Sequence, residues 1–159
     1  MNPTLRSLAT GIFVAVAGIG LLGCKSLNQS ASASFASVRI EGHTAQQICA
    51  ASVVVFQQGG YTVADGLRSE MVFEKEGSRW DQIAYGSWVN PAPVWIRVKV
   101  SMIPLSDDAF RLQCQAYKVR NKGDPLVEDQ VRIGNSHSKP YQALLDEVLG
   151  QLKRALGAG

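Results

Sequence analysis

The sequence has few of the residues that usually carry out chemistry. It contains three cysteines and two histidines among 159 residues. His43 and His137 lie far apart, and neither has a second His or Cys at the close spacing of a metal site. We therefore expect no bound metal, and we expect both histidines to be exposed in loops.

The charge balance and the missing motifs narrow the class of protein further. The 16 basic and 13 acidic side chains give a net charge of +3, without the clustered basic excess of a nucleic-acid-binding protein. The sequence also lacks a G-x-S-x-G motif, an H-E-x-x-H motif, a phosphate-binding loop and a dinucleotide fingerprint. We predict a protein that is not an enzyme, uses no cofactor and binds no nucleic acid. A hydrolase whose catalytic groups meet only in the fold stays open as an alternative.

The N-terminus does have one long apolar run, from Ala9 to Leu22, preceded by the basic residue Arg6. As a helix, this run covers about 21 Å, less than the roughly 30 Å hydrocarbon core that a spanning helix must cross. A basic start followed by a short apolar run is typical of an export signal.

The apolar run ends in Leu21-Leu22-Gly23-Cys24, which resembles the lipobox of bacterial lipoprotein precursors. The resemblance covers the first 24 residues. It implies that residues 1–23 are removed as a signal peptide and that the thiol of Cys24 receives a diacylglycerol. Lys25 stands where an Asp would resemble the signal for retention in the inner membrane. The resemblance therefore predicts a lipid-anchored protein on the periplasmic face of the outer membrane.

A Ser- and Ala-rich stretch follows Cys24, so we assign residues 24–37 to a lipidated tether. The rest of the chain is long enough to form one hydrophobic core. We predict a single domain over residues 38–159.

The first predicted element of this domain is a helix over residues 45–57. Thr44 and Gln47 have the spacing of a capping box, and Gly59 and Gly60 supply a stop. Val54 lies outside the stripe predicted to face the core. We therefore expect the C-terminal helix or a partner to cover the far side of this helix.

The clearest pattern in the sequence predicts a long antiparallel hairpin. Residues 94–102 and 110–117 alternate between apolar and polar side chains, and the composition of Pro104–Asp108 is typical of a turn. Residues 71–75 and 127–133 are predicted as further strands. Ser78 and Asp81 have capping-box spacing, which predicts a short helical turn.

A long C-terminal helix completes the predicted fold. Ser138 is its predicted cap, and the apolar stripe on its inner face comprises Tyr141, Leu144, Leu145, Val148, Leu149, Leu152 and Leu156. The order of elements predicts an α+β fold, in which an N-terminal helix and a long C-terminal helix pack on one face of a curved antiparallel sheet of three to five strands.

Cys49 and Cys114 are both predicted to face the core, one from a helix and one from the sheet. In an oxidising periplasm they would pair as a disulfide. The alternative is two buried free thiols. The sequence does not favour either.

The polar face of the predicted hairpin combines basic and aromatic side chains: Trp95, Arg97, Lys99, Arg111 and Tyr117. One interpretation is that this face binds an anionic surface, peptidoglycan, lipid headgroups or a partner protein. A face that contacts only solvent is the alternative. The aromatic segment with Trp80, Tyr85 and Trp88 either lines a groove or plugs the end of the sheet, and we expect the plug.

The predicted arrangement of helix, curved sheet and long helix is similar to the helix-grip domains of the C subunit of the outer-membrane barrel-assembly machinery. This similarity implies an envelope protein as partner. We predict a lipid-anchored binding or scaffolding module in the periplasm. The alternative is a carrier of a small apolar ligand, which predicts a cavity between the long helix and the sheet.

Overall fold

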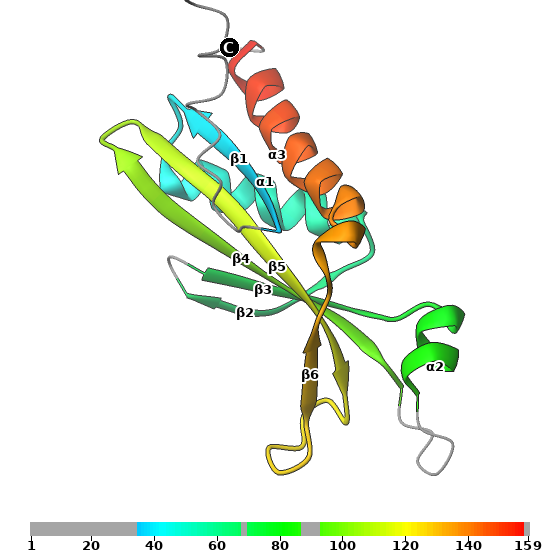
Figure 1. The fold of residues 1–159 in the computed structure, drawn as a ribbon. Helices are drawn as coiled ribbons and strands as arrows, with labels where there is room; N and C mark the ends of the chain where they lie inside the picture. Colours follow the sequence, from blue (N-terminus) through cyan, green and yellow to red (C-terminus); the bar gives the residue numbers. More distant parts are fainter. Residues whose placement is uncertain (1–34, 68–69, 87–92, 158–159) are drawn as a thin grey trace, which may run out of the picture. The chain divides into compact units, whose positions relative to one another are not determined.

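The structure, a computed structural model, describes residues 35–67, 70–86 and 93–157, which belong to a compact unit from Ala33 to Gly159. The predicted signal peptide, Cys24 and most of the predicted tether lie outside the described residues, as does Trp88. The elements in chain order are β1 (Ala36–Glu41), α1 (Ala45–Gln58), β2 (Thr62–Leu67), β3 (Glu70–Glu76), α2 (Arg79–Tyr85), β4 (Trp95–Ser106), β5 (Ala109–Arg120), β6 (Asp129–Arg132), a short 3-10 turn (Asn135–His137) and α3 (Lys139–Gly157) (Figure 1).

The described strands form one antiparallel sheet in the order β1-β5-β4-β3-β2, with β6 also paired to β5. β1 pairs with the first half of β5, where Ala36 faces Cys114, and β6 pairs with the second half, where Arg132 faces Tyr117. The two short strands therefore lie end to end along one edge of β5. The α+β fold with helices on one face of the sheet is confirmed, with six strands in place of the predicted three to five.

The domain begins earlier than its predicted first residue, Val38. β1 starts at Ala36, and the side chain of Phe35 is buried against the ring of Tyr141, with 5.0 Å between the ring centroids. Residues 35–37 therefore belong to the domain and not to the tether. Neither β1 nor β2 was predicted as a strand.

The predicted hairpin is confirmed as β4 and β5, which pair from Trp95 opposite Val119 to Ser106 opposite Ala109. The strands extend further into the predicted turn, which shortens it to Asp107-Asp108. Alternate residues of the sheet point toward the helices and form the core with them: Ile40, Met71, Phe73, Val98, Val100, Leu112, Cys114 and Ala116.

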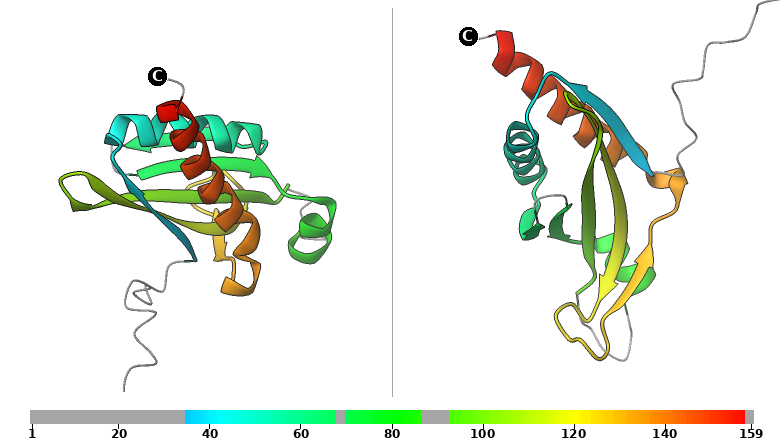
Figure 2. Two further views of the ribbon diagram at one scale, coloured as in Figure 1. Left: turned by 90° about the horizontal axis from the view of Figure 1, so that it is seen from above. Right: turned by 90° about the vertical axis from the view of Figure 1, so that its left-hand side faces the viewer.

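α1 and α3 cover this apolar face of the sheet, and the core joins both helices to the strands (Figure 2). Thr44 caps the N-terminus of α1 with the predicted capping box, and α3 buries Leu145 and Val148 completely. α3 contacts α1, β1 and β5. Among the described residues, no helix combines the length and apolarity needed to cross a membrane.

α2 has the predicted capping box between Ser78 and Asp81, but no residue of α2 is buried. Trp80 is 77% exposed. The expectation that the aromatic segment plugs the end of the sheet is therefore wrong for Trp80.

Candidate functional site

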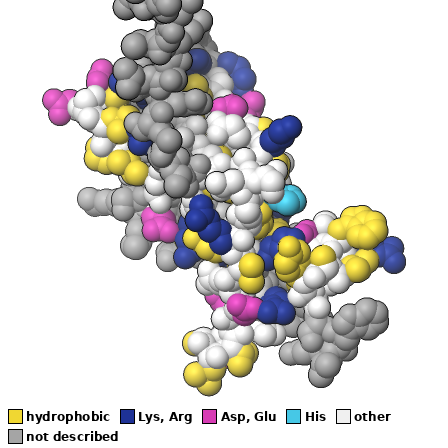
Figure 3. Space-filling model, in the orientation of Figure 1, with side chains coloured by type: hydrophobic (Ala, Val, Ile, Leu, Met, Phe, Trp, Pro, Cys, Tyr) yellow, Lys and Arg dark blue, Asp and Glu magenta, His cyan; other side chains and the backbone are white. Residues whose placement is uncertain are grey.

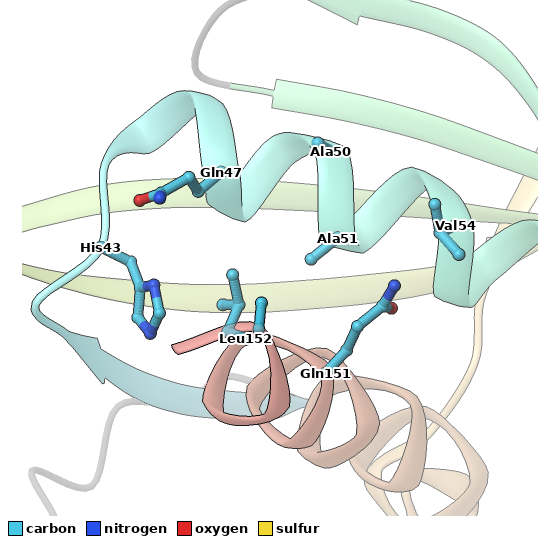
Figure 4. Close-up of a pocket in the computed structure, with 8 residues that line it drawn as sticks. His43, Gln47, Ala50, Ala51, Val54, Gln151 and Leu152 are labelled. Carbon is cyan, nitrogen blue, oxygen red and sulfur yellow. The ribbon is translucent and has the colours of Figure 1, made fainter. Parts of the chain in front are cut away.

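A groove of about 300 Å³ lies between α1 and the C-terminal half of α3 (Figure 4). Its lining is mostly apolar, with polar side chains among it. The residues that line it are His43, Gln47, Ala50, Ala51, Val54, Gln151, Leu152 and Ala155.

The turn between β1 and α1 brings His43 into this groove. Gly42 adopts a positive φ of 70°, and its backbone N–H donates to the carbonyl of Asp108 at 2.9 Å. This turn places the His43 ring beside Leu152 of α3, where it is only 7% exposed (Figure 4). The prediction that His43 is exposed is therefore wrong, whereas His137 is exposed as predicted.

α1 contributes the longer wall of the groove, and none of its 14 residues is charged. Ile48, Val55 and Phe56 point into the core, while Ala50 and Val54 lie on the other side and remain exposed. α3 lies beside α1 and leaves this outer side partly uncovered. An exposed helix surface without charge has the composition of a protein interface, where charged residues are depleted.

The five residues predicted as a binding face all lie on the face of the sheet opposite the helices. Trp95, Arg97, Lys99, Arg111 and Tyr117 are half-buried there. Arg97 lies directly opposite Tyr117, and the Lys99 ammonium lies 5.2 Å from the centroid of the Tyr117 ring.

Arg97, the cation at the centre of this face, is already paired with carboxylates of the same chain. The guanidinium of Arg97 donates from Nε to Glu74 at 2.5 Å and from Nη1 to Glu128 at 2.6 Å. Lys122 lies 2.6 Å from the other Glu74 oxygen and 3.7 Å from the Trp95 ring centroid. Glu74, Lys122 and Glu128 were not predicted as site residues, because only the strand register and the β5–β6 turn bring them to Arg97.

Glu74 remains ionised in this network although its side chain is only 3% exposed. Burial alone raises the pKa of Glu74, but hydrogen bonds from Lys122 and Arg97 hold it below its ordinary value. The bond from Arg97 likewise lowers the pKa of Glu128 to about 2. An anionic ligand would have to compete with these carboxylates for Arg97.

The two domain cysteines are free thiols in the structure. Cys114 is 1% exposed in the centre of the sheet, and burial raises its pKa to about 12. Burial also raises the pKa of Cys49 on α1. Neither thiol has the lowered pKa of a reactive cysteine.

A second, smaller hollow of about 170 Å³ lies between α2, β6 and the turn before α3. Ser136 Oγ lies 3.0 Å from His137 Nδ1 at its edge, and both side chains are exposed. Lys118 in this hollow is paired with Asp81 at 2.8 Å and lies over the ring of Tyr85. Among the residues that the structure describes, no group of three His, Cys, Asp or Glu side chains is placed to hold a metal.

A scan of protein-family models gives no match for this chain, and a search of curated proteins gives none either. Among solved structures, the chain is similar to the adenylate sensor from AMP-activated protein kinase, solved in complex with 5-aminoimidazole-4-carboxamide 1-beta-D-ribofuranotide. The identity is 14%, the TM-score is 0.40, and the match covers 72% of this chain and 93% of the other. A similarity at this level carries no argument about function.

Proposed function

We propose that this chain is a lipid-anchored protein of the bacterial envelope whose domain binds a partner protein in the groove between α1 and α3. The anchor is proposed from the lipobox resemblance at Cys24, and the periplasmic face of the outer membrane from Lys25. The observation that carries the binding role is the uncharged helix α1, which exposes one side next to an apolar groove.

The proposed occupant is an amphipathic helix of the partner with an uncharged apolar face. Two helices wall the groove, and the 14 residues of α1 extend over about 21 Å. A third helix laid between them would insert apolar side chains over the small residues Ala50 and Ala51. Gln47 and Gln151 supply hydrogen-bonding groups at the groove, and α1 presents no charge that such a helix must neutralise.

The alternative role as a carrier needs a cavity between α3 and the sheet. Side chains that are 1% exposed or less occupy this space, among them Leu145 and Val148 of α3 and Leu112 and Cys114 of β5. The open groove between the two helices suits a segment of a protein better than an enclosed small ligand.

The binding role is tested with a photo-crosslinking amino acid in place of Val54, in living cells. We expect a discrete protein adduct, which Ala50→Arg abolishes because a long charged side chain then fills the groove. The matched control is the same crosslinker in place of Val63, a residue of β2 that is 44% exposed. A synthetic peptide that covers the crosslinked segment should then bind the purified protein. The same adducts from Val63, or an adduct that Ala50→Arg leaves intact, would contradict the proposal.

The anchor has a separate test. Cys24→Ser should leave an unprocessed precursor without an acyl label. A Cys24→Ser protein that is still processed and still partitions into the membrane would refute the proposed lipid anchor, whatever the groove binds.

A further inference from the structure

α2 is an amphipathic helix with its apolar side turned outward. Trp80 and Ile83, three positions apart and hence on one side of the helix, are 77% and 59% exposed. Two polar side chains of α2, those of Asp81 and Gln82, bond to the rest of the domain instead. Asp81 pairs with Lys118 at 2.8 Å, and the Gln82 amide accepts from the backbone N–H of Val94 at 2.7 Å. These bonds fix the helix with its apolar side in water.

The turn between β5 and β6 also carries an apolar side chain outward. Leu126 is 93% exposed. The turn is held by local hydrogen bonds: the N–H of Leu126 donates to Asp124 Oδ1 at 3.0 Å, and the N–H of Gly123 donates to Glu128 Oε2 at 3.0 Å. Because Glu128 is paired with Arg97, this turn is fastened to the sheet while Leu126 remains exposed.

α2 and the β5–β6 turn project from the same end of the sheet. The strand ends meet there, with Glu76 opposite Trp95, Trp95 opposite Val119, and Arg120 opposite Asp129. Figure 3 shows hydrophobic side chains gathered over α2 and again over the β5–β6 turn. The groove lies toward the other end, since His43 follows Gly42, which is bonded to Asp108 in the β4–β5 turn.

We propose that these two tips, α2 with Trp80 and Ile83 and the β5–β6 turn with Leu126, contact the surface of the lipid bilayer. The inference rests on the proposed lipid anchor at Cys24. Trp is enriched at membrane interfaces, and Arg79 beside it can extend its charge into the headgroups. Two separate protruding tips fit a deformable bilayer better than the continuous, shape-complementary patch of a protein interface.

The length of chain between the anchor and the domain permits this contact. Ala36, at the start of β1, lies opposite Cys114, and Cys114 is six positions before the end of β5 at Arg120. At about 3.4 Å per residue, the strand end is roughly 20 Å away. Cys24 and Phe35 are 11 positions apart, which allows a span of up to about 40 Å. The lipid and both tips can therefore reach the same bilayer.

Quenching of Trp80 fluorescence by brominated lipid tests the contact. The full lipidated chain carries Trp88→Phe and Trp95→Phe, so that Trp80 is its only tryptophan, and is reconstituted in vesicles of phosphatidylethanolamine and phosphatidylglycerol. We expect the emission of Trp80 to shift to the blue when the chain binds the vesicles, and to fall in intensity when the acyl chains are brominated. The matched control carries Trp80→Phe as well and Val54→Trp near the groove. Its emission should not change.

A second version of the experiment, in which a histidine tag replaces the lipid anchor, separates the bilayer contact from the proposed anchor. The domain from Ala33 onward contains every residue of the described core, so we expect it to fold on its own. It can be attached by an N-terminal histidine tag to a nickel-chelating lipid, and a cooperative thermal melt of the tagged domain verifies its folding first. Quenching in this format together with an unmodified Cys24 in the cell would refute the anchor alone. Unquenched Trp80 in both formats would overturn the bilayer contact and leave the anchor standing. Quenching in the tagged format only would also overturn it, because the native tether would then not bring the tips to the lipid.

Discussion

Glu74→Gln tests the ion network on the open face of the sheet. The substitution keeps the shape of the side chain and removes its charge, so Arg97 and Lys122 lose the carboxylate they share. Breaking a buried ion pair by removing one partner costs about 3 to 5 kcal/mol. Arg97 keeps Glu128, and the Lys122 side chain is 30% exposed and therefore partly screened by solvent. We expect a loss at the lower end, about 3 kcal/mol.

Urea unfolding at two pH values measures this effect. With a slope of about 1.5 kcal/mol per M urea, the midpoint should fall by roughly 2 M at pH 7. The folded protein holds the pKa of Glu74 below its ordinary value, so its ionisation stabilises the fold above the unfolded pKa of about 4.3. That contribution is lost as the pH falls through the folded pKa. The difference in urea midpoint between the parent protein and Glu74→Gln should therefore become smaller at acidic pH.

Glu76→Gln is the matched control, because Glu76 is exposed on the same strand. Its effect should stay within about 0.5 kcal/mol. If Glu74→Gln also left the midpoint unchanged at pH 7, or if its deficit grew on acidification, the account of the network would be wrong.

Two further predictions concern the core. The double substitution Leu145→Ala and Leu149→Ala in α3 should largely unfold the domain, since Leu145 is fully buried. Truncation of a buried Leu to Ala costs about 2 to 5 kcal/mol, and the free energy of unfolding of a whole domain is about 5 to 15 kcal/mol. The exposed control is Asp146→Ala. If the thermal midpoint of the double variant lay within a degree or two of that of the parent, α3 would not be part of the core. Cys114, with its pKa raised to about 12, should resist alkylation at pH 8 in the folded protein, and in urea without reductant both thiols should react. Peptide maps under nonreducing conditions that join Cys49 to Cys114 would contradict the free thiols.

Most elements of the fold could be predicted because their signals are local. The capping residues Thr44 and Ser78 start helices in the structure, and the strict alternation along β4 and β5 gives a hairpin. β1 and β2 were missed, and both are edge strands of the described sheet. Among the described strands β2 pairs with β3 alone, and it contains Gly66 and has an irregular register after Val63. The partner strand determines such an element more than its own residue preferences.

The groove was less accessible to prediction because its walls come from distant parts of the chain. α1 and the end of α3 are separated by nearly the whole domain, and only packing brings Val54 near Gln151. The one available signal was the second apolar side of the predicted N-terminal helix. The outward side of α2 had no such signal, because the spacing of Trp80 and Ile83 is equally typical of a core-facing helix.

The sheet face and the exposed tips differ in the free energy that they offer a ligand. Arg97 on the sheet face already donates to Glu74 and Glu128. The free energy that an anion gains by binding there is therefore only the difference between its own pairing with Arg97 and the pairing with these carboxylates. At the tips, Trp80 and Leu126 contact water, and covering a large apolar side chain gains about 1.5 to 3 kcal/mol. Substitution of Arg97 should therefore change mainly stability. Substitution of Trp80 should change what the domain contacts and leave its stability nearly unaltered.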